Sequence, residues 1–159
     1  MAELDDRVDQ TEADALNRLG INALRSFPGV GIVSWGARTL ASPESDVPEW
    51  RYLPVRRTAL MLEQSIERGT GWAAVEPNDE QLWARLRESV GSFMFALHQR
   101  GAFAGATPRD KYFVRCDEET TTARDVEEGV VNILVGFAPL RPAEFVILRI
   151  SRRAGRAER

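Results

Sequence analysis

The sequence predicts an α+β protein in which a mixed β-sheet carries two main helices packed on it. Two patterns lead to this prediction. Strand-like and helix-like segments alternate through the middle of the chain, and two strand-like segments stand together near its end, an order typical of helices packed on a sheet. The 159 residues are 43% hydrophobic and 28% charged, which is the composition of a folded domain with a core.

The N-terminal third is predicted to be extended and rich in loops. Residues 1–18 are expected to form an acidic arm, and residues 31–35 a short strand after the weakly alternating segment 21–25. Residues 41–49 are polar with two prolines and are predicted to be a loop. Residues 50–55 are predicted to be a short strand or another extended segment.

Two helices are predicted in the middle of the chain. The first runs from about residue 55 to 68, because Ala59, Leu62 and Ile66 repeat at helical spacing and Gly69 is suited to a C-terminal cap. Residues 72–75 are predicted to be a short buried strand. The second helix begins after Asn78 or Asp79 as N-cap and ends near residue 100. Its apolar stripe consists of Leu82, Leu86, Val90, Phe93 and Leu97.

The last third is predicted to be mostly strands. Residues 101–109 are expected to form a turn, 111–116 a strand, 120–128 a short capped helix, and 130–138 and 144–150 two further strands. The final strand is apolar on both faces until Arg149. Such a strand is safe in the centre of a sheet, whereas at an edge its free N–H and C=O groups recruit other chains. It is therefore either a central strand of its own sheet or an intersubunit strand that acts by β-augmentation. The intersubunit strand would comprise Phe145, Val146, Ile147, Leu148, Arg149 and Ile150.

The residue types needed for catalysis or metal binding are sparse. One histidine, His98, and one cysteine, Cys116, cannot form a conventional zinc site. His98 is expected at a surface or boundary, Cys116 in a buried strand, and the acidic run 117–119 in a solvated turn. No apolar run approaches the roughly 18 residues of a membrane span, and the slightly negative middle of the chain shows no nucleic-acid footprint. We expect no catalytic residue, no cofactor, no metal, no nucleic acid, no membrane insertion, and no enzyme activity.

The two ends of the chain carry opposite charge. Acidic residues dominate the first 14 positions and arginines the last 11. These ends are either solvated tails or segments that pair with each other on neighbouring subunits, in which case the pairing would be sensitive to salt.

Several ordered blocks make the sequence similar to a known family. The blocks are residues 20–29 (GINALRSFPG), 35–40 (WGARTL), 50–52 (WRY), 55–57 (VRR), 64–70 (QSIERGT), 72 (W), 76–78 (EPN), 82–85 (LWAR), 101–108 (GAFAGATP), 113–117 (FVRCD) and 142–147 (PAEFVI). They resemble the C-terminal domain of tail sheath proteins from contractile phages and related injection systems.

The resemblance implies a structural role. Family members polymerise around an inner tube and shorten to drive it into a target envelope, and terminal strands tie their subunits together. It implies a homo-oligomer with an inner tube protein and baseplate or cap proteins as partners. The chain would be made in the cytoplasm and built into a tail-like particle. The second helix is expected to touch the tube, with Arg85, Arg87 and Arg100 as candidate contacts.

The predicted organisation is an acidic arm at 1–18, a sheath-like domain at 19–151 and a basic tail at 152–159. The family's bulky preceding domain and complete N-terminal arm are not in this sequence. The chain is therefore expected to be an excised domain or a naturally short protein. A short protein could serve as an adaptor or cap at the end of a sheath, the alternative to a lattice subunit.

Overall fold

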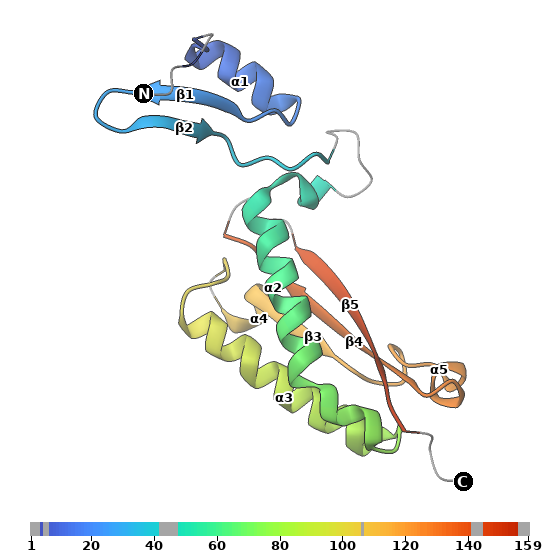
Figure 1. Cartoon of the computed structure of the whole chain (residues 1–159). Coiled ribbons are helices and arrows are strands. Elements are labelled where there is room, and N and C mark those ends of the chain that lie inside the picture. The colour runs from blue at the N-terminus through green and yellow to red at the C-terminus, as the bar shows by residue number, and fades with distance from the viewer. Residues whose placement is uncertain (1–3, 5–6, 42–47, 106, 141–144, 156–159) are drawn as a thin grey trace. The chain divides into compact units, whose positions relative to one another are not determined.

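A computed structural model describes residues 4, 7–41, 48–105, 107–140 and 145–155. The chain divides into two compact units, residues 1–58 and 59–159, and each is described by itself (Figure 1). Most of the predicted loop at 41–49 lies outside the described residues, as do position 106 of the predicted turn and position 144 of the last predicted strand.

The first unit contains a helix and a two-stranded hairpin. Helix α1 (Gln10–Arg18) begins at a capping box in which Asp9 accepts from the amide of Glu12 and Glu12 accepts from that of Asp9. Strands β1 (Ala23–Phe27) and β2 (Gly31–Trp35) pair antiparallel. Part of the predicted arm at 1–18 is therefore helical, because the capping box satisfies amides that an extended arm would leave to water.

The segment after the hairpin is helical, so the extended structure predicted for residues 50–55 is wrong. A short 3-10 helix, η1 (Pro48–Arg51), leads into α2 (Leu53–Gly69). Val55 is almost fully buried and begins the same helical stripe as Ala59 and Leu62. This periodicity overrides the strand propensity of the aromatic residues before it.

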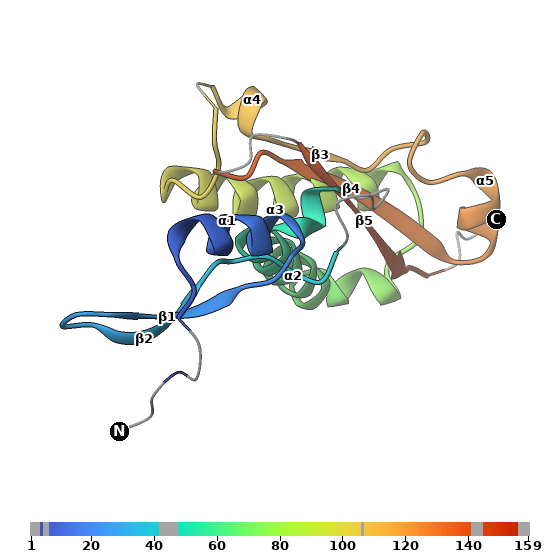
Figure 2. The same cartoon turned by 90° about the horizontal axis from the view of Figure 1, so that it is seen from above.

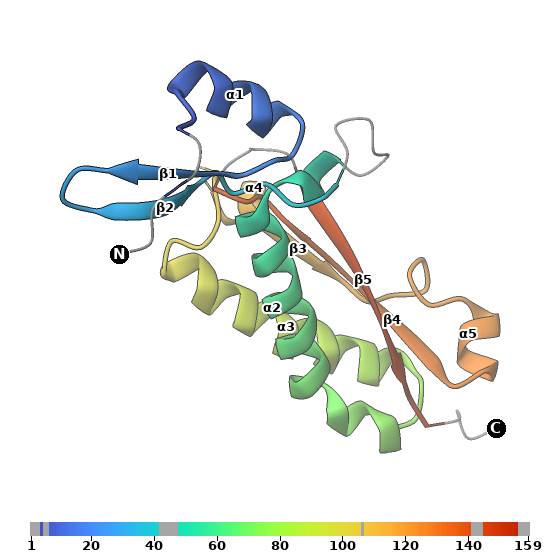
Figure 3. The ribbon, with the colours of Figure 1, turned by 45° about the horizontal axis from the view of Figure 1, so that its top comes forward.

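The second unit is built on a three-stranded antiparallel sheet with the order β3-β4-β5. Its strands are β3 (Tyr112–Arg115), β4 (Val130–Phe137) and β5 (Val146–Arg153). Helix α2 from Ala59 onward and helix α3 (Glu80–Gln99) lie on the same side of the sheet (Figures 1 and 3). The predicted α+β class is confirmed, although every strand pair in the described residues is antiparallel, where a mixed sheet was predicted.

The core of this unit lies between the helices and the sheet. The helices contribute Leu62, Ile66, Leu82, Leu86, Val90 and Met94, and the strands contribute Val131, Ile133, Val135, Phe137, Val146, Leu148 and Ile150, all buried. Helix α3 begins at Asp79, whose carboxylate accepts from the Leu82 amide, as predicted. Met94 is buried where Phe93 and Leu97 were predicted, so the apolar stripe keeps a spacing of four residues.

The shorter elements refine the predictions. Residues 71–75 form a 3-10 helix, η2 (Gly71–Val75), and not a buried strand; Val75 is 85% exposed. A short helix, α4 (Pro108–Lys111), precedes β3, and α5 (Ala123–Glu127) is capped by Thr122. Strand β5 continues to Arg153, three residues beyond the predicted end, because Ser151–Arg153 pair with Val130–Asn132. No helix in the described ranges is long and apolar enough to cross a membrane.

Candidate functional site

Strand β5 lies at an edge of its sheet, with β4 between it and β3 (Figure 2). Its burial alternates: Val146, Leu148 and Ile150 are buried, whereas Ile147 is 57% exposed and Arg149 is exposed. Both faces of the strand are apolar before Arg149, but only one of them packs on the helices and the other is open. All of β5 pairs with β4 of the same chain, and only its outer edge is left for another strand.

The register determines which backbone groups form that outer edge. The Ala154 amide donates to the Gly129 carbonyl at 2.9 Å, so Ala154 belongs to the set of residues that bond toward β4. In an antiparallel ladder this set alternates along the strand. Ile147, Arg149, Ser151 and Arg153 therefore direct their N–H and C=O groups away from β4. No backbone partner for these groups is found in the described part of the chain, whereas the next outward amide, that of Gly155, donates to the Glu76 carbonyl at 2.8 Å.

Phe145, just before β5, is fixed by an aromatic contact on the open face of the sheet. Its ring lies parallel to that of Phe113, with centroids 5.9 Å apart. The Phe113 ring lies over Gly136 of β4, where a Cβ atom would approach ring atoms Cζ and Cδ1 to 2.6 and 2.7 Å. Glycine at 136 thus leaves the space that the Phe113 ring fills, and Ile147 continues the same row on β5.

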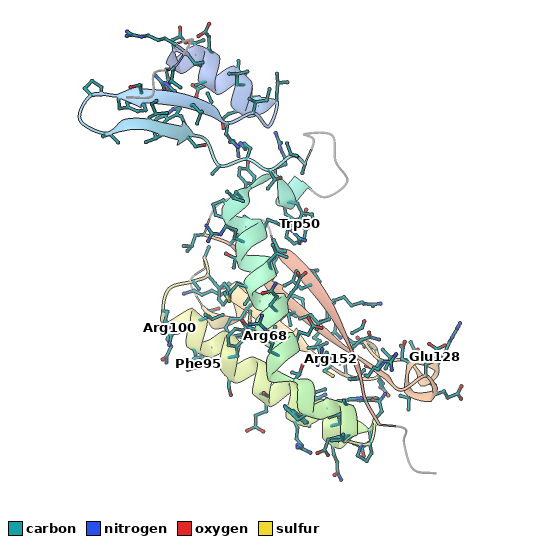
Figure 4. All side chains as sticks on the ribbon, in the orientation of Figure 1. Trp50, Arg68, Phe95, Arg100, Glu128 and Arg152 are labelled. Atoms are coloured by element: carbon teal, nitrogen blue, oxygen red, sulfur yellow. The ribbon has the colours of Figure 1, made fainter. Side chains whose placement is uncertain are left out.

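The three arginines predicted to touch a tube differ in their surroundings. Arg85 pairs with Glu76 at 2.9 Å, and its guanidinium lies 4.6 Å from the centroid of the Trp72 ring. Arg87 pairs with Glu80 at 2.6 Å and donates to the Cys116 carbonyl. Arg100 is exposed at the end of α3 and has no ion pair among the described residues (Figure 4). Of the three, Arg100 is thus the one left free for a partner.

The surroundings of His98 and Cys116 are those of residues with a structural role. His98 lies between the rings of Phe95 and Tyr112, with centroids 5.9 and 6.3 Å away. Cys116 is buried, and burial raises the pKa of its thiol to about 12, so the unreactive thiol is the dominant form at neutral pH. His98 is half-buried at a boundary, as predicted, and Cys116 is buried, as predicted, although it follows β3 and is not part of the strand.

Sequence reasoning missed a buried polar contact at Asn78. Its side-chain amide donates to the Val130 carbonyl at 2.9 Å, and its carbonyl oxygen accepts from the Trp83 indole at 2.9 Å. Asn78 is 2% exposed and ties the start of α3 to the start of β4. The sequence predicts Asn78 only as a possible helix cap. The available signal for the buried contact was Trp83, five positions later, whose indole N–H needs an acceptor.

The WGARTL block also has a structural explanation in the first unit. A Cβ atom at Gly36 would meet the side-chain oxygens of Asn22 and Asn17 at 2.5 and 2.6 Å. Asn17 donates to the Trp35 carbonyl, and Asn22 exchanges two hydrogen bonds with the Arg38 backbone. Glycine at 36 therefore leaves room for two asparagines, one on α1 and one just before β1, to hold the end of β2 and the segment after it.

These features can be compared with known proteins. A family model described as the phage tail sheath C-terminal domain matches residues 45–153. No curated protein matches the chain. The chain is 36% identical to a chain of the anti-feeding prophage baseplate, with a TM-score of 0.76 over 95% of this chain and 41% of that one.

Two further solved structures are similar to the chain. A chain from the sheath complex of PVC, an extracellular contractile injection system, in its contracted state is 36% identical, with a TM-score of 0.75 over 92% of this chain and 41% of that one. The sheath tail protein of Desulfitobacterium hafniense is 10% identical, with a TM-score of 0.71 over 94% of this chain and 33% of that one, which shows a shared fold.

The chain spans about 41% of the length of the two contractile-system chains that it matches. The predicted resemblance rests on blocks spread along the chain, and the family model covers most of those blocks. The matched family and structures are those of structural sheath proteins. The chain therefore belongs to the family of phage tail sheath C-terminal domains.

Proposed function

We propose that this chain acts as a building block of a contractile tail sheath. In this role it polymerises around an inner tube, and the assembly shortens to drive the tube into a target envelope. The similar chains come from a sheath complex in its contracted state and from a baseplate, which supports a role in such an assembly. The partners in this proposal are further copies of the chain, the inner tube protein, and baseplate or cap proteins. Synthesis takes place in the cytoplasm, before the chain joins a tail-like particle.

The observation that carries the proposal is the outer edge of β5. Four consecutive outward residues, from Ile147 to Arg153, offer backbone donors and acceptors that the described residues leave without partners. An exposed edge of this length recruits an extended segment by β-augmentation. The predicted intersubunit strand thus acts here as the receiver of a strand, while its inner face remains part of the core.

The test blocks pairing at the outer edge of β5 and keeps β5 itself in the sheet. Proline at position 151 lacks the outward N–H and places its ring where an added strand would pair, yet leaves the hydrogen bonds to β4 in place. Truncation before β5 is unsuitable, because Val146, Leu148 and Ile150 are core residues. Ser151→Ala is the matched control, since the Ser151 hydroxyl donates to Asn132 at 2.7 Å and both variants lose that bond.

Assembly is followed by electron microscopy of the purified chain, alone and with its inner tube, at low and moderate salt. We expect rings or tubes for the native chain and for Ser151→Ala, and none for Ser151→Pro, with circular dichroism showing that all three are folded. Normal assembly of a folded Ser151→Pro chain would refute the role of the edge. A uniform monomer in every condition would instead favour the adaptor or cap.

The tube contact is tested separately at Arg100. Charge reversal by Arg100→Glu is expected to weaken cosedimentation with tubes while leaving self-assembly intact, because Arg100 is exposed and takes part in no described ion pair. Unchanged cosedimentation would place the tube contact elsewhere on the chain.

A further inference from the structure

We propose that the outer edge of β5 selects an acidic strand and disfavours pairing with a second copy of β5. The proposal rests on the proposed function, in which this edge receives a strand from another chain. It adds the chemistry of the strand that fits. The residues that set this chemistry are Arg149 and Arg153, on the open face of β5.

These two arginines are free to meet a partner. Both are exposed, both are outward residues of the edge, and neither has a carboxylate within 4.0 Å in the described ranges. Arg152, on the opposite face, pairs with Glu67 at 3.2 Å, and its side chain is only 20% exposed. Asp125, the acid of α5 on which Arg149 acts electrostatically, is already engaged by both the amide and the hydroxyl of Thr122.

Pairing between two copies of β5 brings these charges together. With all four outward residues in an antiparallel two-fold register, Ile147 of one copy opposes Arg153 of the other and Arg149 opposes Ser151. The two Arg149 side chains are then diagonal neighbours, about 7–8 Å apart at the backbone. A shift by one step of the ladder sets Arg149 opposite Arg149, or Arg149 opposite Arg153. Each arrangement places like charges side by side and so opposes self-pairing.

The same spacing defines the strand that fits. Arg149 and Arg153 are about 13 Å apart along the strand, at about 3.3 Å per residue, so each acts as a separate site at ordinary salt. A matching antiparallel segment carries two acidic residues four positions apart, with an apolar residue two positions beyond the second acid, opposite Ile147. The chemistry is that of an extended acidic segment with alternating side chains.

Two synthetic peptides probe this edge in the full chain. One is TETVTETVT, which sets its glutamates opposite Arg153 and Arg149, and the other is TKTVTKTVT, which sets lysines there. Binding is measured by fluorescence anisotropy, and the site of binding by amide hydrogen exchange resolved to single residues. We expect the glutamate peptide to bind about tenfold more tightly than the lysine peptide, the sum of two exposed charge pairs. Exchange should slow at the amides of Ile147, Arg149, Ser151 and Arg153.

Charge reversal supplies the decisive comparison. The double variant R149E/R153E should reverse the preference between the two peptides. The matched control R57E/R68E makes the same change of charge at two exposed positions of α2 and should keep the native preference. Equal binding of both peptides to the native chain, no binding of either, or protection at other amides would overturn the proposal.

This outcome is distinguishable from failure of the proposed function. Rings or tubes from a chain that ignores peptide charge would leave the sheath role standing and remove the charge selection. A monomeric chain that binds the glutamate peptide at the β5 edge would retain the selection and remove the role as a self-assembling lattice subunit.

Discussion

Replacement of Gly136 by alanine should destabilise the native chain. The same replacement should stabilise a chain in which Phe113 is also replaced by alanine. Gly136 lies near the C-terminal end of the central strand β4, and the Phe113 ring covers it. Its φ is not positive, so the backbone accepts alanine without strain. Any cost of the substitution therefore comes from the aromatic ring above it.

The magnitude follows from that contact. In the native chain the new methyl group would come within 2.6 and 2.7 Å of two ring carbons, so the ring must move. Overpacking of this kind costs about 1–3 kcal/mol, and displacement of Phe113 from Phe145 forfeits about 0.5–1.5 kcal/mol of stacking. In a Phe113→Ala background the space is empty. Alanine should then stabilise the strand by about 0.5–1 kcal/mol, because glycine loses more backbone entropy on folding.

Urea denaturation of four chains, followed by circular dichroism, tests this reasoning. They are the native chain, Gly136→Ala, Phe113→Ala, and the double variant. The free energies of unfolding give the coupling between the two sites, which should exceed about 1.5 kcal/mol. The argument fails if Gly136→Ala has the same effect in both backgrounds, since the ring would then not be the cause.

Three further predictions concern single sites. Asn78→Ala should lower the free energy of unfolding by about 2–3 kcal/mol in the same urea assay, because the Trp83 indole and a backbone carbonyl lose their partner; a loss below about 0.5 kcal/mol would contradict this. Cys116 should resist iodoacetamide at pH 8 until the chain unfolds, since burial raises the pKa of its thiol to about 12; fast alkylation of the folded chain would show otherwise. Hydrogen bonds from Thr122 lower the pKa of Asp125 from 3.8, so this cap should stabilise the fold above pH 4 and weaken as the pH falls below that value; Thr122→Ala should reduce this acid dependence in pH-resolved melts.

The helices of the second unit were predictable because a local pattern determines them. Residues close together in the sequence determine both the four-residue spacing of the apolar side chains on α3 and the cap at Asp79. The short segments misled the prediction for the same reason. Residues 71–75 and 50–55 carry aromatic and branched side chains that favour strands. The helical spacing of Val55 with Ala59 and Leu62, and the burial of Ala73, select helical turns in their place.

The site was predictable only in part. The sequence indicated a strand capable of recruiting another chain at 145–150, but it could not show which face packs on the helices. The position of β5 at an edge depends on the order of strands in the sheet, and the outward set of amides depends on a register fixed by long-range pairing with β4. The partners of Arg85 and Arg87 lie nine and seven positions away and are likewise products of the fold.

The alternation along β5 also bears on how such a domain can evolve. A substitution at one of the outward positions changes what the strand presents and leaves the core untouched. Insertion or deletion of one residue before Arg149 or Arg153 would turn that arginine toward the helices, since every side chain beyond the change would switch face. The number of residues in this strand is therefore constrained, whereas the residue types at its outward positions can change. Duplicated genes can in this way acquire new binding partners on one inherited scaffold.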